Sequence, residues 1–180
     1  MTHFNPINAL LQLLDLEDSA QAEDALYELF DALIGRAEFK IIDTAADELA
    51  ELEQALHDNI SKTAWDSYLE FSLKLAERHG HLMQGMYAHG FRSRLRAHGK
   101  TYDPAVVCTA VYEALTAQSD VTYSDDLQQL HAAFQEHVDA EGREAETAYW
   151  EAMRQFYYQA EIAAFQMGND AGARLIAFIN

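Results

Sequence analysis

The apolar residues of the chain recur mostly at spacings of three and four, which is the period of an amphipathic helix. Between Ser19 and Ile34, one helical face carries Ala22, Leu26, Leu29, Phe30 and Leu33. Asp24, Glu28 and Asp31 lie on the opposite face, and Gly35 follows as a C-terminal stop. The pattern predicts a helix over residues 19–34 with an acidic outer face.

A second amphipathic helix is expected from Thr44, where Thr44 and Asp47 resemble a capping box. Its apolar stripe is Leu49, Leu52, Leu56 and Ile60. Asp47, Glu51 and Asp58 line the opposite side. Residues 36–43 fit either a continued helix or a short extended connection.

Both prolines follow a residue that caps helices well, in Asn5-Pro6 and Asp103-Pro104. The cap oxygen accepts an orphan amide hydrogen bond, and proline has no amide of its own to satisfy. Helices are therefore expected over 6–16 and 104–116. The polar segment 119–126 predicts a break, after which Ser124 caps a helix that runs to about Ala140.

Two longer helices complete the expected fold. Residues 61–98 contain no proline and span ~55 Å if they form one helix, with a kink allowed by three glycines. The last helix is expected from Gly142 to the C-terminus, and from Phe156 onwards it is apolar on all sides. Such a helix must be enclosed, either at the centre of a bundle or by another subunit.

A shift of 78 positions aligns Tyr87 with Phe165 and Gly90 with Gly168. Helical periodicity alone produces some of this agreement, so an internal duplication and a chance match both stay open. The fold class predicted is all-α, a bundle of about six to seven helices in a single domain over residues 1–180. Its possible halves are 1–99 and 100–180, as two pseudo-repeated hairpins with long second helices.

Composition agrees with a helical protein and excludes several function classes. The chain of 180 residues is 49% hydrophobic and has only two prolines and eight glycines, too few for a sandwich or barrel. Cys108 is the single cysteine, so no intrachain disulfide is possible. The N-terminus has no basic region before its apolar stretch, and we expect no signal peptide, no membrane span and a cytoplasmic location.

Charge is strongly asymmetric along the chain. Thirty acidic against twelve basic side chains give a net charge of −18, which disfavours direct binding to nucleic acid or to anionic lipid. Residues 61–103 are the exception, with seven basic and four acidic side chains. Arg92 and Arg96 of this segment share a helical face. Three roles stay open for them: holding the acidic helices, binding an anion, or remaining solvated.

The chain contains no strong catalytic or cofactor motif. No P-loop, G-x-S-x-G, H-E-x-x-H or paired C-x-x-C is present. Glu77 and His81 are four residues apart, whereas di-iron bundles use Glu-x-x-His. The cluster of four histidines, His79, His81, His89 and His98, is separated by helical projection, and we predict no catalytic residue, metal site or cofactor.

The stretch from Phe165 to Leu175, FQMGNDAGARL, is the one motif with a resemblance. It resembles the F-x-x-G-x-x-x-G-A-R-L ending of small uncharacterised helical proteins of Gram-positive bacteria and their mobile elements. The resemblance implies an origin and brings no activity with it.

The acidic faces therefore carry the functional prediction. Their carboxylates lie ~6 Å apart along each helix, similar to the spacing of successive phosphates. We predict a non-enzymatic interaction module, an inhibitor that occupies a basic nucleic-acid-binding groove of a protein partner, as anti-defence proteins of mobile elements do. The expected partner-binding residues are Asp24, Glu28, Asp31, Asp47, Glu51 and Asp58. The alternatives are an obligate helical homo-oligomer or adaptor, and a metal-dependent all-helical phosphohydrolase.

Overall fold

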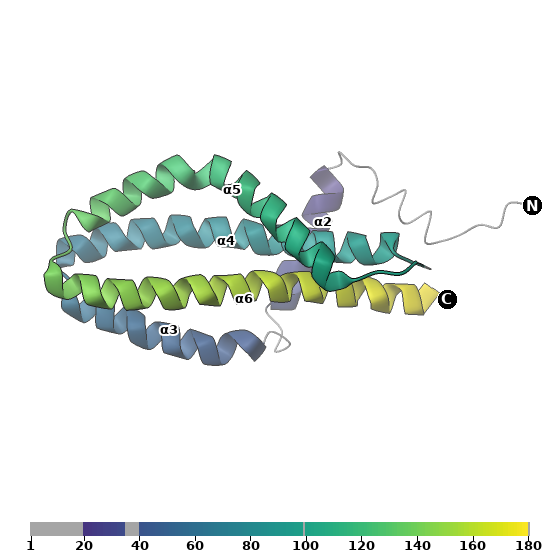
Figure 1. The fold of residues 1–180 in the computed structure, drawn as a ribbon, viewed down its shortest axis with the longest axis horizontal. Helices are drawn as coiled ribbons and strands as arrows, with labels where there is room; N and C mark the ends of the chain where they lie inside the picture. The colour runs from purple at the N-terminus through teal and green to yellow at the C-terminus, as the bar shows by residue number, and fades with distance from the viewer. Residues whose placement is uncertain (1–19, 35–39, 99, 180) are drawn as a thin grey trace, which may run out of the picture. The chain divides into compact units, whose positions relative to one another are not determined.

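The described part of the chain is all-α. The computed structural model describes residues 20–34, 40–98 and 100–179 and contains no strand in these ranges. Five helices pack there: α2 (Ala20–Ile34), α3 (Lys40–Asn59), α4 (Lys62–Arg96), α5 (Pro104–Gln135) and α6 (Ala140–Ile179) (Figure 1). The helix expected over 6–16 lies outside the described residues. None of the described helices combines the length and the apolarity needed to cross a membrane.

The helices divide between two compact units, each of which draws on both halves of the chain. The α3 unit contains α3, α4 up to His81, α5 from Thr116 and α6 up to Ala160. The α2 unit contains α2 and the remaining parts of α4, α5 and α6.

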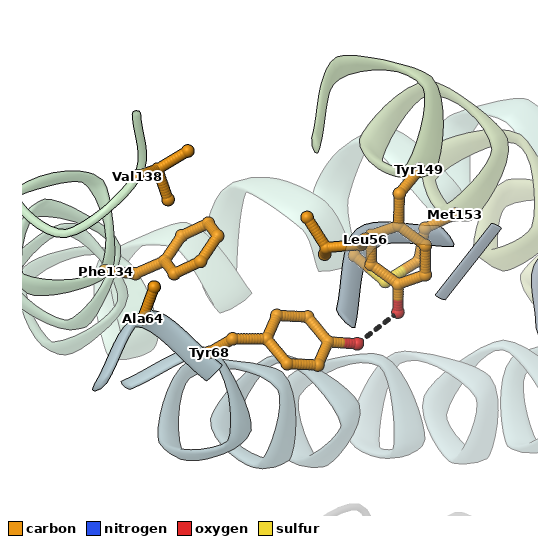
Figure 2. Packing of buried hydrophobic residues seen from close by; sticks show 7 residues of the cluster. All are labelled: Leu56, Ala64, Tyr68, Phe134, Val138, Tyr149 and Met153. Atoms are coloured by element: carbon orange, nitrogen blue, oxygen red, sulfur yellow. Dashed lines mark hydrogen bonds between the residues drawn. The ribbon is translucent and has the colours of Figure 1, made fainter. Parts of the chain in front are cut away.

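The α3 unit has an aromatic core. Its buried members are Leu56, Ala64, Tyr68, Phe134, Val138, Tyr149 and Met153 (Figure 2). Leu49 and Leu52 of α3, and Ile60 directly after it, pack against this cluster, as the periodicity predicts. The burial of this apolar stripe fixes which side of α3 faces outwards.

In the α2 unit, α4 and α6 approach each other through glycines. A Cβ atom on Gly90 would lie 2.2 Å from the carbonyl oxygen of Phe165, and one on Gly168 would lie 2.0 Å from that of Tyr87. Real Cβ atoms do not come this close to backbone, so only glycine permits this separation. The two contacts are reciprocal, because Gly90 and Gly168 are 78 positions apart in the sequence, and so are Tyr87 and Phe165.

Equivalent capping bonds begin the two longest helices. The Ser61 hydroxyl accepts a hydrogen bond from the backbone N–H of Ala64 at 3.1 Å, and the Asp139 carboxylate accepts one from Gly142 at 2.9 Å. Both caps satisfy an orphan amide of the first turn. Ser61 and Asp139 are again 78 residues apart.

Three predicted helix boundaries are wrong, the start at Thr44, the end at residue 116 and the start at Ser124. Helix α3 already begins at Lys40, so Thr44 does not start it. A helix that has formed extends readily, because each further residue that joins it adds one backbone hydrogen bond. No break occurs at residues 119–126, because α5 is continuous from Pro104 to Gln135, so the helix does not end at residue 116 and Ser124 does not cap a new one. Ser119 and Tyr123, four residues apart on one face, are buried and hold this polar segment in the helix. The start at Pro104 is confirmed, with Asp103 capping the amide of Ala105.

Helix α6 is enclosed along only part of its apolar half. Phe165 is buried, but Tyr158 is 47% exposed and Phe178 is 89% exposed. The described residues therefore do not enclose α6 on all sides, as a position at the centre of the bundle would require.

The glycine contacts predict opposite effects of alanine at two positions in α4. Gly90→Ala should lower the free energy of unfolding by about 1–3 kcal/mol, because the new methyl group meets the backbone of α6. A Cβ atom on Gly80 would meet no other atom within 4 Å, so Gly80→Ala should raise stability by up to about 1 kcal/mol through helix propensity. Urea unfolding of both variants tests this, and equal effects of the two substitutions would contradict it.

Candidate functional site

The outer side of α3 carries three of the predicted carboxylates. Asp47, Glu51 and Asp58 are all exposed, and we call them the acidic face of α3. The apolar stripe of the same helix packs into the core of the α3 unit. The predicted division of α3 into an apolar and an acidic side is confirmed.

Two side chains of the same helix contact Asp58, and one of them is a histidine. Asp58 accepts a hydrogen bond from Gln54 Nε2 at 2.8 Å and lies 3.3 Å from His57 Nδ1. Within the described residues, none of the three carboxylates pairs with a lysine or arginine. The face therefore presents its negative charge to solvent.

Helix α2 carries the other predicted set, Asp24, Glu28 and Asp31, which are also exposed. Asp31 accepts a hydrogen bond from Gln84 Nε2 of α4 at 3.3 Å. This set belongs to the α2 unit, whereas the acidic face of α3 belongs to the α3 unit.

A chain of hydrogen bonds anchors α3 to α4 and α6. The Tyr68 hydroxyl donates to Glu53 Oε1 at 2.5 Å and shares a second hydrogen bond with the Tyr149 hydroxyl at 2.7 Å (Figure 2). Glu53 lies on α3, so this bond adds a directional contact to the burial of the apolar stripe. Together they hold the acidic face in its outward orientation.

Burial also shifts the acidity of both tyrosines. Desolvation raises the pKa of Tyr149 to about 12. Desolvation and the hydrogen bond to Glu53 raise the pKa of Tyr68 further. Both hydroxyls therefore stay protonated at neutral pH and remain available as donors.

Some basic residues of α4 are engaged with acidic residues of α5. Arg78 Nη2 lies 2.6 Å from Asp120 Oδ1, and Lys74 Nζ lies 3.8 Å from Asp126 Oδ2. Lys74 also pairs with Glu77 at 3.1 Å. Through Lys74 and Arg78, α4 therefore pairs with carboxylates of α5, while the three roles considered for Arg92 and Arg96 stay open.

The histidines and the cysteine take separate places. His79 stacks on Tyr157 with a ring separation of 3.8 Å, and His81 contacts the Tyr123 hydroxyl. Cys108 is buried, and desolvation raises the pKa of its thiol. In the described residues, no group of three or more histidine, cysteine, aspartate or glutamate side chains is arranged to hold a metal ion.

Sequence reasoning missed a hollow in the α3 unit. It has a volume of about 350 Å³ and is lined from α4, α5 and α6 by rings, two arginines and two histidines. The sequence does place two of the lining residues, Trp150 and Arg154, on one face of α6. Periodicity alone does not show which other helices this face meets.

Comparison with protein-family models, with curated proteins and with solved structures finds no match to the chain. Its function therefore has to be inferred from the residues and contacts described above.

The tyrosine pair predicts a loss of stability at alkaline pH. Unfolded tyrosine loses its proton near pH 10, whereas folded Tyr149 keeps its proton up to about pH 12. Its stabilising contribution is therefore complete below pH 10 and falls between pH 10 and 12, by about 1.4 kcal/mol per pH unit. Urea unfolding from pH 8 to 11.5 should show a smaller decline for Tyr149→Phe than for the wild type.

Equal slopes for the wild type and Tyr149→Phe would contradict the prediction.

Proposed function

We infer that the protein is a non-enzymatic interaction module that presents the acidic face of α3 to a basic surface of a protein partner. The observation that carries this is the exposure of Asp47, Glu51 and Asp58 without a lysine or arginine partner in the described residues. A helix whose other side is fixed in a core can offer this face without reorganising.

The charge of the whole chain supports the same function. A net charge of −18 steers association towards positive surfaces and accelerates encounter with a basic partner. The exposed set on α2, Asp24, Glu28 and Asp31, adds further negative charge to the chain.

We take the partner's basic surface to be a nucleic-acid-binding groove. Along α3, Asp47 lies ~6 Å from Glu51 and Glu51 lies ~10 Å from Asp58, which presents negative charge at a spacing of the same order as that of phosphates. Occupying such a groove would block nucleic acid, as an anti-defence inhibitor of a mobile element does. The resemblance of residues 165–175 to proteins of mobile elements supports this choice, as does the cytoplasmic location expected from the sequence.

A homo-oligomer or adaptor is the second candidate. It is favoured by Phe178 near the end of α6, which is 89% exposed within the chain. Contact with another subunit would remove this large apolar side chain from water.

The two hairpins, α3 with α4 and α5 with α6, are proposed to be pseudo-repeats. Three observations at the same offset of 78 support this: the caps Ser61 and Asp139, the first residues of α4 and α6, and the reciprocal glycine contacts. A further helix over 6–16 would bring the bundle to six helices.

Charge reversal on α3 tests the interaction. The triple variant Asp47→Lys, Glu51→Lys, Asp58→Lys should retain its helical circular dichroism, since all three side chains are exposed. It should lose the partner that the wild-type protein captures from its native cells. The captured partner, once purified, should bind duplex DNA, and the wild-type protein should compete with that DNA in a salt-sensitive manner.

The matched control is Glu136→Lys, Glu144→Lys, Glu151→Lys, which makes the same charge change at exposed positions, one directly after α5 and two on α6. Retained binding by the control and loss by the α3 variant support the proposal. Binding that survives reversal on α3, with only solubility reduced, would show that the acidic face merely keeps the protein in solution.

A further inference from the structure

The hollow of the α3 unit has the size of a small-molecule site. Its volume of about 350 Å³ falls at the lower end of the range for ligand pockets, roughly 300–1,000 Å³. A second hollow of about 250 Å³ shares Phe71, Arg78 and His131 with it. The shared residues show that the two hollows adjoin.

The walls of the larger hollow are planar and held in place. Phe71 and Trp150 meet edge to face with their ring centres 5.1 Å apart, and His79 stacks on Tyr157 at 3.8 Å. Such surfaces accept a flat aromatic group, because ring faces pair with other rings in offset or edge-on contacts.

A buried carboxylate orients part of this wall. Trp150 Nε1 donates a hydrogen bond to Glu146 Oε1 at 3.0 Å, and His131 Nε2 lies 3.6 Å from the same oxygen. Gln135 also donates to Glu146. The indole and the imidazole are therefore fixed before any ligand arrives.

Two guanidinium groups supply positive charge. Arg78 lies between the two hollows, its side chain only 14% exposed, and its bond to Asp120 leaves other N–H donors of the guanidinium in place. Arg154 lines the larger hollow, is exposed, and forms no ion pair within the described part of the chain. Its charge is free to meet an anion.

The net charge narrows the class of ligand. A chain with a net charge of −18 repels anions in general, and it repels multiply charged ones most. A carboxylate carries one negative charge and matches the planar fork of arginine. We propose that this hollow binds a small planar aromatic carboxylate, whose ring lies between Trp150 and Tyr157 and whose carboxylate pairs with Arg154 and Arg78.

Titration calorimetry with 1-naphthoate tests the site on the full chain. Saturable binding is expected, and the indole N–H signal of Trp150, assigned with Trp150→Phe, should shift in the NMR spectrum. Arg154→Gln should weaken binding about tenfold, because it removes a charge-assisted hydrogen bond. Arg143→Gln, at an exposed position of the same helix outside the hollow, should leave the affinity unchanged.

Two further probes define the chemistry. Neutral 1-naphthamide and dianionic 1-naphthyl phosphate should both bind more weakly than 1-naphthoate. Any of three results would overturn the proposal: no saturable binding of 1-naphthoate, equal weakening by Arg143→Gln and Arg154→Gln, or either probe binding as tightly as 1-naphthoate.

Discussion

Contact between the backbones of α4 and α6 at Gly90 and Gly168 sets the packing of the α2 unit. Each glycine faces a carbonyl group of the other helix at a distance that leaves no room for a Cβ atom. This approach buries Tyr87 and Phe165, which lie one turn before the two glycines. The F-x-x-G spacing of the C-terminal motif therefore has a packing explanation: the phenylalanine carbonyl and the glycine are both used at one helix crossing.

The α3 unit depends on a different constraint, a core in which two tyrosine hydroxyls must keep hydrogen-bond partners. Tyr68 and Tyr149 bond to each other, and Glu53 of α3 accepts from Tyr68. Burial of the apolar stripe decides which side of α3 faces the core, and the bond to Glu53 adds a directional contact in the same orientation. The same orientation turns Asp47, Glu51 and Asp58 towards solvent, so the core chemistry of the unit and its acidic surface are linked.

The basic side chains pair with some of the acidic residues and leave others exposed. Arg78 and Lys74 of α4 reach the carboxylates of α5 and offset charge repulsion between helices of an acidic chain. The acidic face of α3 has no such cationic partner in the described residues. This difference separates carboxylates that serve the fold from those that stay exposed without a lysine or arginine partner in the described residues, whereas counts of acidic residues in the sequence treat both alike. Arg154, exposed beside a hollow lined by rings, is open to an anion in the same sense.

The sequence by itself determined the helical class, the inward stripe Leu49, Leu52 and Leu56, and the outward carboxylates of α3, because helical periodicity sorts side chains between core and solvent. It also located the Asp103 cap, which acts through adjacent residues. Only the tertiary structure decided that residues 119–126 remain helical, since contacts of Tyr123 and Asp120 with α4 outweigh a weak local preference for a turn. Tertiary structure likewise brought Arg78, Trp150 and Arg154 around one hollow, because residues on different helices meet only through packing, which periodicity within one helix does not encode.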